Sequence, residues 1–353
     1  MKQLIKLVED GLNKKDYSGL AVEVIHKGET IFSSCYGEHA SQEHLFDLAS
    51  LTKPLCTAFL SSVLIEKKAV ETSTLIGDIY SDYAISLNPA LNNIAVSNLL
   101  DHSSGLEAWF PIYKTVSSRS DAYLFVRSRN TSYKTSDKNV YSDLGYIMLG
   151  EIVEILFEKR LDYLFEHYIT QPLELTKLDF MPLGQEDTKT GLKFVPTGYS
   201  DVRKKDLVGE VNDENAVVFD GVAGHAGLFG NIKDVSRLTS HILNIIKGRE
   251  ENDNLSQATL IKMIEKKNNS DWTFGWHYPS QKNSSAGQLL SKNSIGMTGF
   301  TGTSIWMDLD NDVAITLLSN RTISPNAIKF GGESDGFTIL RPLIHDAIMG
   351  EII

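Results

Sequence analysis

The sequence predicts an α+β fold in which both ends of the chain contribute strands to one sheet and the middle of the chain forms a mainly helical lobe. Strand-like runs joined by short turns occur at residues 19–36 and again at residues 303–319. Between residues 70 and 245, helical periodicity alternates with long irregular loops. With 353 residues, of which 42% are hydrophobic, the chain is long enough for two such parts. A cleft between two lobes is a common place for a functional site.

The first elements of the chain are a helix and a hairpin. Apolar residues recur at helical spacing across residues 2–15. Two strand-like runs follow at residues 19–26 and 30–36, and the turn at residues 27–29 between them indicates a hairpin. The next segment begins at Ser50 and carries apolar residues every four positions, which is typical of a helix with one buried face.

The middle of the chain contains five further helical segments. The strongest pattern spans residues 144–157, and the others are expected at residues 96–101, 121–127, 161–170 and 234–247. Residues 181–224 have little periodicity and several turn signals, so this long stretch is either functional or poorly ordered.

The last hundred residues return to strands. Strands are expected at residues 272–278, 303–309 and 313–319, and residues 310–312 join the last two as a hairpin. A final helix is expected over residues 337–348. The expected domain limits are residues 1–45 with 246–353 for the sheet domain and residues 46–245 for the helical domain.

The composition narrows the function classes. A formal net charge of −11 and a pI near 5.3 argue against nucleic acid or an anionic membrane as a partner. No stretch approaches the roughly 20 apolar residues of a membrane span, and the N-terminus lacks the pattern of a signal peptide. We therefore expect a cytoplasmic protein, or a periplasmic one if a signal was removed.

Motifs for metals and cofactors are missing from the sequence. The two cysteines, Cys35 and Cys56, are too few for a disulfide framework or a zinc site. There is no H-E-x-x-H, G-x-S-x-G or P-loop pattern, which removes zincins, α/β-hydrolases and Walker-type phosphate binding as first choices. We expect no metal and no cofactor.

A serine three residues before a lysine is the first candidate for catalysis. Ser50 and Lys53 are the one such pair in the sequence, and positions i and i+3 share one face of a helix. A serine hydroxyl is a poor nucleophile without a neighbouring base, and a lysine whose pKa is lowered by burial can act as that base. The pair therefore predicts a nucleophilic serine hydrolase.

Two more polar side chains come just before the strongest helix. Tyr141 is able to relay a proton when a nearby cation lowers its pKa, and Asp143 is able to hold Lys53 or to accept from a substrate amide. Without Ser50, a core tyrosine followed by an ordinary helix N-cap is the better interpretation of this stretch.

Two glycine-rich stretches are further candidates. Small residues at 296–302 let a substrate lie against the backbone and let a main-chain N–H point at a developing oxyanion, although a glycine-rich turn is the common alternative. His225 lies among the glycines of residues 221–229. For His225 we weigh a loop-ordering role above catalysis by roughly two to one.

Three of these stretches follow one another in a family-specific order. Ser50-x-x-Lys53, then Tyr141-x-Asp143, then the triplet at residues 297–299 is the order in which penicillin-recognising serine enzymes carry their active-site elements. The chain resembles the class C β-lactamase-like serine hydrolases, a group that includes D-alanyl-D-alanine carboxypeptidases, other penicillin-binding proteins and esterases. The resemblance spans residues 18–322 and includes residues 99–106, 141–146, 221–229 and 299–304.

This resemblance implies a fold and a set of roles. The fold is an antiparallel sheet flanked by helices, with an all-helical second domain and the active site between them. Ser50 is acylated, Lys53 is the base or proton carrier, and Tyr141 shares this proton traffic. The backbone N–H groups of Ser50 and Phe300 form the oxyanion hole. The residues implied to bind substrate are Asp143, Thr298, Gly299 and Phe300.

Two positions depart from the family pattern. Asp143 stands where many relatives have asparagine, and a carboxylate there stabilises a charged Lys53 and discourages its use as a neutral base. Met297 stands where relatives usually carry lysine or histidine, which helps to hold the substrate carboxylate and supports the acidity of the tyrosine. Methionine does neither, so we expect weak or no β-lactamase activity.

We therefore predict a serine hydrolase that forms an acyl-enzyme at Ser50 and acts on a small ester, amide or D-amino-acid peptide. Two alternatives stay open. One is a non-catalytic ligand-binding protein that keeps the cleft, which Met297 favours. The other is an acyltransferase, in which an alcohol or amine intercepts the acyl-enzyme. The natural substrate and the oligomeric state are left open.

Overall fold

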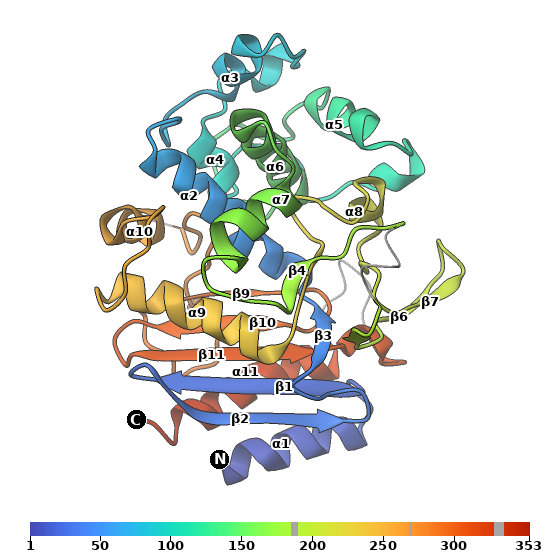
Figure 1. Cartoon of the computed structure of the whole chain (residues 1–353), viewed down its shortest axis with the longest axis vertical. Helices are drawn as coiled ribbons and strands as arrows, with labels where there is room; N and C mark the ends of the chain where they lie inside the picture. The colour runs from blue at the N-terminus through green and yellow to red at the C-terminus, as the bar shows by residue number, and fades with distance from the viewer. Residues whose placement is uncertain (185–189, 268–269, 328–334) are drawn as a thin grey trace.

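Both ends of the chain meet in one five-stranded antiparallel sheet (Figure 1). The structure, a computed structural model, describes residues 1–184, 190–267, 270–327 and 335–353. β1 pairs with β11 from Leu20 to His26, so the N-terminal and the C-terminal hairpins lie side by side. The strand order is β2 (Glu29–Gly37), β1 (Gly19–His26), β11 (Val313–Ser319), β10 (Ser304–Asp308) and β9 (Ser294–Thr298).

Helices cover both faces of this sheet. α1 (Lys2–Asn13) and α11 (Gly336–Met349) pack on one face, where Leu20 and Trp306 are buried beneath them. α9 (Ile232–Ile246) covers the opposite face and contacts β1 and β11 (Figure 1). Successive side chains of a strand point to opposite faces, so each strand contributes to both hydrophobic layers.

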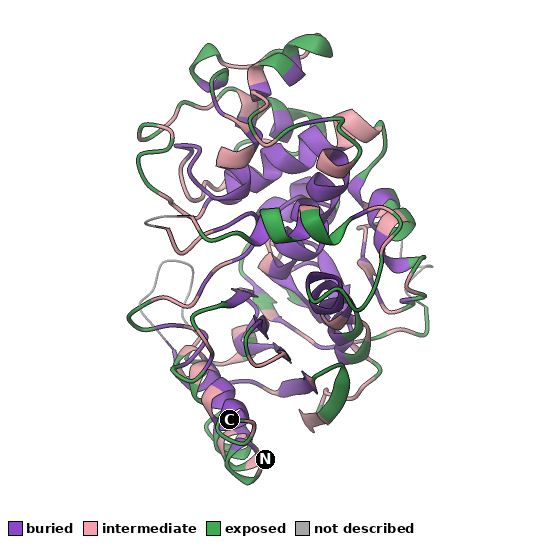
Figure 2. Ribbon diagram, turned by 90° about the vertical axis from the view of Figure 1, so that its left-hand side faces the viewer, coloured by how far each residue is buried: buried purple, intermediate pink, exposed green. Residues whose placement is uncertain are grey.

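The middle of the chain forms a helical part around one buried helix. This helix, α6 (Asp143–Phe157), packs against α2, α4 and α5 and is buried throughout residues 143–153. The Ser142 hydroxyl caps it by accepting from the Gly145 amide at 3.0 Å. The other helices are α2 (Phe59–Glu66), α3 (Ile76–Asp82), α4 (Val96–Leu100), α5 (Arg119–Arg127), α7 (Leu161–Phe165), α8 (Glu214–Val218) and α10 (Gln257–Ile264). Buried residues fill the interior of both the sheet part and the helical part (Figure 2).

A second, smaller sheet leads the chain to the serine predicted as nucleophile. β3 ends at Asp47, directly before the segment that contains Ser50. β6 (Gly198–Ser200) and β7 (Lys205–Leu207) form a separate hairpin in the stretch with little sequence periodicity, of which residues 185–189 lie outside the described residues. The small sheet has the order β4 (Leu178–Phe180), β8 (Leu228–Gly230), β3 (His44–Asp47) and β5 (Lys193–Phe194).

The predicted α+β fold with an antiparallel sheet flanked by helices is confirmed. The strand predicted at residues 272–278 is wrong, because the chain turns back on itself there. Thr273 N donates to Trp276 O at 2.9 Å, and Gly275 between them has φ +86°.

The division into domains stays a prediction, and α9, which ends at the expected limit, packs on the sheet. Among the helices that the structure describes, none combines the length and the apolar character that a bilayer span requires.

Candidate active site

Ser50 lies in a segment of irregular helix. A 3-10 turn over Ala49–Leu51 is followed by a π-helical stretch over Lys53–Ala58, and the regular helix α2 begins only after it. The sequence pattern indicated a helix here and did not distinguish these forms. Ala49 has φ +47°, a conformation that non-glycine residues rarely adopt, and its amide donates to Asp47 Oδ1 at 2.8 Å. Such strained backbone clusters at functional sites, because the surrounding structure must hold it.

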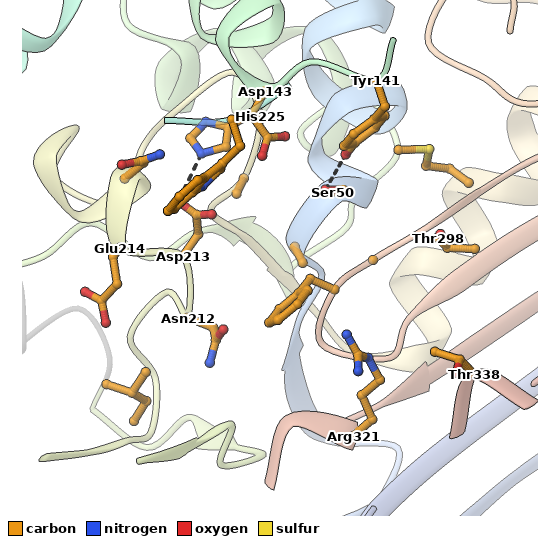
Figure 3. A pocket seen from close by; sticks show the side chains of 18 of the residues that line it. Ser50, Tyr141, Asp143, Asn212, Asp213, Glu214, His225, Thr298, Arg321 and Thr338 are labelled. Carbon is orange, nitrogen blue, oxygen red and sulfur yellow. Dashed lines mark hydrogen bonds and ion pairs between the residues drawn. The ribbon is translucent and has the colours of Figure 1, made fainter. Parts of the chain in front are cut away.

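Four of the predicted side chains meet at Ser50 Oγ and Lys53 Nζ. Lys53 Nζ lies 3.0 Å from Ser50 Oγ and 2.7 Å from Asp143 Oδ1. Tyr141 donates its hydroxyl proton to Ser50 Oγ at 2.6 Å. Lys53 also donates to the main-chain carbonyl of His225 at 2.9 Å. Ser50, Tyr141, Asp143 and His225 border one cavity of about 760 Å³ (Figure 3).

Burial sets the protonation of this cluster. The Lys53 side chain is fully buried, and this burial lowers its pKa, while the carboxylates of Asp143 and Asp213 act against the shift. Burial also raises the pKa of Tyr141 well above its ordinary value, and the charge of Asp143 adds to this rise. Tyr141 is therefore a neutral phenol at neutral pH, which agrees with its donation to Ser50.

The turn after β9 is tied to the backbone that precedes Ser50. Thr301 Oγ1 donates to Asp47 O at 2.6 Å, and Thr303 Oγ1 donates to Leu48 O at 3.0 Å. At Gly299 any Cβ would lie 2.6 Å from Leu48 O, so only glycine fits between the two segments. These contacts bring Phe300 to the rim of the same cavity. That the Ser50 and Phe300 amides form an oxyanion hole stays a prediction.

The cavity lacks a cation at the position of the predicted third motif. Met297 lies in β9 and is 3% exposed, and Thr298 lines the cavity beside it. The guanidinium groups that line the cavity come from elsewhere in the chain. Arg321 forms an ion pair with Asp335, and burial lowers the pKa of Arg341 in α11 to about 10.

Sequence reasoning missed several side chains of this cavity. Asp213 comes from the stretch with little periodicity, and Arg321 and Arg341 lie outside every motif singled out. His102 lies in a stretch noted for its resemblance, but it was given no role. Its Nδ1 accepts from Ser142 N at 3.0 Å, and its ring packs 4.7 Å from that of Tyr141. Burial keeps the pKa of His102 well below its ordinary value, so the ring is neutral. Across the described parts of the chain, no three His, Cys, Asp or Glu side chains are grouped to hold a metal ion.

Comparison with known proteins identifies the family of the chain. A family model described as Beta-lactamase matches residues 4–329. The chain belongs to the beta-lactamase family. Membership confirms the predicted resemblance and the prediction of a serine hydrolase.

Relatives within the beta-lactamase family differ in their described activities. A protein of Escherichia coli O157:H7 named "Putative D-alanyl-D-alanine carboxypeptidase" is 30% identical, and the match covers 88% of this chain and 80% of that protein. An N-acetylmuramyl-L-alanine amidase of Bacillus subtilis (strain 168) is also 30% identical, over 88% of this chain and 78% of the relative. The crystal structure of a class C beta-lactamase from Rhodobacter sphaeroides matches all of both chains with a TM-score of 0.73 at 16% identity, which shows a shared fold.

Proposed function

We propose that this chain hydrolyses a small ester, amide or D-amino-acid peptide through an acyl-enzyme formed at Ser50. The observation that carries the proposal is the double contact of Ser50 Oγ, which lies 2.6 Å from the Tyr141 hydroxyl and 3.0 Å from the buried Lys53 amine. A nucleophile held between a base and a proton donor is the arrangement that acyl transfer requires.

The protonation states assign the proposed roles. Tyr141 donates to Ser50 and is neutral, so it is not the base in the resting enzyme. Lys53, whose pKa burial lowers, takes the proton of Ser50 as Oγ attacks the substrate carbonyl. The amides of Ser50 and Phe300 stabilise the oxyanion. The proton passes by way of Lys53 and Tyr141 to the leaving group, and water then cleaves the ester and restores the Ser50 hydroxyl.

The charges of the cavity support a substrate other than a β-lactam. Met297 supplies no cation to the cavity, and the guanidinium groups of Arg321 and Arg341 lie on the sheet and α11 side of the cavity instead. A substrate carboxylate is held by such groups together with the Thr298 hydroxyl. The names of the two relatives, a carboxypeptidase and an amidase, support a peptide or amide bond as the one cleaved.

Intact-mass spectrometry tests the proposal. The wild type and Ser50→Ala are exposed to p-nitrophenyl esters, D-Ala-D-Ala peptides, penicillins and an activated phosphonate. We expect a covalent adduct on the wild type with the phosphonate and at least one ester or peptide, slow or no reaction with penicillin, and no adduct on Ser50→Ala. Failure of every reagent to label Ser50, or equal turnover by the Ser50→Ala variant, contradicts the proposal.

A non-catalytic binding protein is the second candidate, and Met297 and Asp143 favour it. Met297 offers no cation to support the acidity of Tyr141, and the Asp143 carboxylate opposes the fall in the pKa of Lys53. Turnover of a p-nitrophenyl ester that depends on Ser50 excludes this candidate. Repeating the assay with an added alcohol separates a hydrolase from an acyltransferase, because only an acyltransferase yields the exchanged ester as the main product.

A further inference from the structure

Lys53 has three polar neighbours, and two of them are acceptors without a proton to give. A neutral lysine amine carries two N–H bonds and one lone pair. The His225 carbonyl accepts one N–H bond of Lys53 at 2.9 Å, and the Asp143 carboxylate is the ion-pair partner of the amine at 2.7 Å. When the amine is neutral and its two N–H bonds are directed at these two acceptors, its lone pair is left for the remaining neighbour, Ser50 Oγ at 3.0 Å. The position of the His225 carbonyl thus decides whether the base points at the nucleophile.

The side chain of His225 is itself buried and anchored. The residue is 1% exposed, and its Nε2 lies 3.0 Å from Asp213 Oδ1. Because a carboxylate only accepts, Nε2 carries the proton and donates it. The other ring nitrogen, Nδ1, is buried without a hydrogen-bond partner among the residues that the structure describes. Asp213 is held in turn as the N-cap of α8, where it accepts from Ala216 N at 2.8 Å.

The neighbour of Asp213 in the chain, Asn212, is linked through Asp47 to the backbone before Ser50. Asn212 N donates to Asp47 Oδ2 at 2.6 Å, and Asp47 Oδ1 accepts from the amide of Ala49, which precedes Ser50. Residues 212 and 213 therefore connect to the backbone before the nucleophile and, through His225, to the base. Figure 3 shows Asn212, Asp213 and His225 on the same side of the cavity, with Asp213 directed at the imidazole.

We propose that His225 and Asp213 are a positioning pair that holds Lys53 with its lone pair on Ser50. The inference rests on the proposed function, in which Lys53 is the base. Neither residue forms a bond with the substrate in this role. The groups that face Lys53 are Asp143 and Tyr146 of α6, Tyr141 before α6, His102 after α4, and the pair itself.

The first test measures the acylation rate in single-turnover experiments with an ester identified as above. His225→Ala removes the ring and leaves the carbonyl unsupported, so we expect acylation to slow by about tenfold to a hundredfold, as for the loss of one hydrogen bond to a charged group. His225→Gln keeps an N–H donor toward Asp213 and should restore most of the rate. This rescue distinguishes positioning from a general need for histidine chemistry.

The second test uses the charge of Asp213. Asp213→Asn keeps an acceptor for His225 and a cap for α8 but removes a negative charge that raises the pKa of Lys53. The pKa of Lys53 therefore falls, and the rise of the acylation rate with pH should begin at a lower pH than in the wild type. A residue with a purely structural role does not move this profile.

A matched control lies in α9, outside the cavity. The buried His241 pairs with the exposed Glu250 at 2.5 Å, and His241→Gln should leave the rate and the pH profile of acylation unchanged. Wild-type rates and profiles in all three variants of the positioning pair would overturn the inference. So would a loss confined to deacylation, which would make His225 a group that acts on water. If His225→Ala does not fold, the acylation rates and pH profiles of His225→Gln and Asp213→Asn test the inference instead. If the proposed function itself is wrong, the wild type shows no labelling of Ser50, which distinguishes that result from the outcomes above.

Discussion

At the scale of single residues, the carboxylate of Asp143 sets the charge beside Lys53. Asp143 lies 2.7 Å from Lys53 Nζ, and its side chain is only 7% exposed. It raises the pKa of Lys53 against the effect of burial. In Asp143→Asn the pKa of Lys53 should fall, and the acylation rate should begin to rise at a lower pH than in the wild type. The measurement is the pH profile of single-turnover acylation.

Asp143→Asn should also change stability in a pH-dependent way. Below the pKa of Lys53 the variant buries a charged amine without its carboxylate, which costs about 3–5 kcal/mol. Above that pKa the amine is neutral and the loss is smaller. Urea unfolding at several pH values tests this, with Asp121→Asn in α5 as the exposed control. If the pH profile of acylation in Asp143→Asn is unchanged, or is shifted to higher pH, then the charge of Asp143 does not raise the pKa of Lys53.

The Tyr141 hydroxyl offers a second prediction. Tyr141→Phe removes the proton donor 2.6 Å from Ser50 Oγ and leaves the ring packed against His102. We expect kcat/KM to fall by about 10²- to 10⁴-fold, the usual contribution of a positioned proton carrier, with little change in the urea midpoint. Turnover within a few-fold of the wild type would show that Lys53 alone carries the proton.

Residues near Ser50 were predictable when a local pattern marked them. Ser50 and Lys53 share a spacing of three, and Tyr141 and Asp143 precede the most periodic helix, so the sequence could place all four in one site. Asp213 and Arg341 could not be placed this way. Their position at the cavity depends on how α8 and α11 pack on distant parts of the chain, and no local signal encodes that packing.

At the scale of elements, the sequence predicted the segments with regular apolar spacing well. It did not predict the π-helical stretch after Ser50 or the strand β9. α1, α6, α11 and the two hairpins follow regular apolar spacing, and each lies within a few residues of its expected limits. Apolar residues every four positions after Ser50 suit both the π-helical stretch and an α-helix, so the sequence did not separate them. No strand was expected at β9, which overlaps the glycine-rich stretch at residues 296–302. Gly296 is needed there, since a Cβ would meet the Trp306 ring at 2.3 Å.

The packing of α6 against the His225 loop gives a prediction at this scale. Gly150 Cβ, if present, would lie 2.9 Å from Gly224 Cα, whereas a Cβ at Gly145 on the same helix meets nothing closer than 3.6 Å. Gly150→Ala should therefore destabilise the fold by about 1–3 kcal/mol. Gly145→Ala is the matched control and should be neutral or stabilising by up to about 1 kcal/mol. Urea unfolding measures both, and equal effects would mean that the helix and the loop are not in close contact.

At the scale of the whole molecule, the hairpins at both ends of the chain had suggested one sheet, and the pairing of β1 with β11 joins them. Where the sheet part ends and the helical part begins depends on long-range packing, as α9 illustrates by lying on the sheet. The expected limits of residues 1–45 and 246–353 stay a prediction. The cavity is lined from both parts, with Tyr141 from the helical part and Thr298 from the sheet.

Stability of the whole molecule should depend on pH through buried carboxyl groups of the helical part and the small sheet. Burial raises the pKa of Glu151 in α6 and of Asp179 in β4 to about 7. In the unfolded chain both groups ionise near about pH 4. Between about pH 6.5 and pH 8 they therefore release protons only in the folded state. The stability that they contribute is complete below about pH 4 and is lost as the pH rises through about 7.

Variants separate the contribution of these carboxyl groups to stability from that of Lys53. Because the pKa of Lys53 is lowered in the folded state, Lys53 makes stability rise with pH, whereas the carboxyl groups make it fall. Glu151→Gln keeps an acceptor for the Tyr80 hydroxyl, which donates to Glu151 at 2.8 Å, and removes the titration. From about pH 6.5 to pH 8, the free energy of unfolding of the wild type should fall relative to Glu151→Gln by about 1 kcal/mol, and Asp179→Asn should show the same trend. Glu9→Gln, which alters an exposed carboxylate of α1, is the control. Parallel curves for the wild type and Glu151→Gln would show that the carboxyl group of Glu151 does not titrate in this range, because a group with equal charge in both states adds no slope.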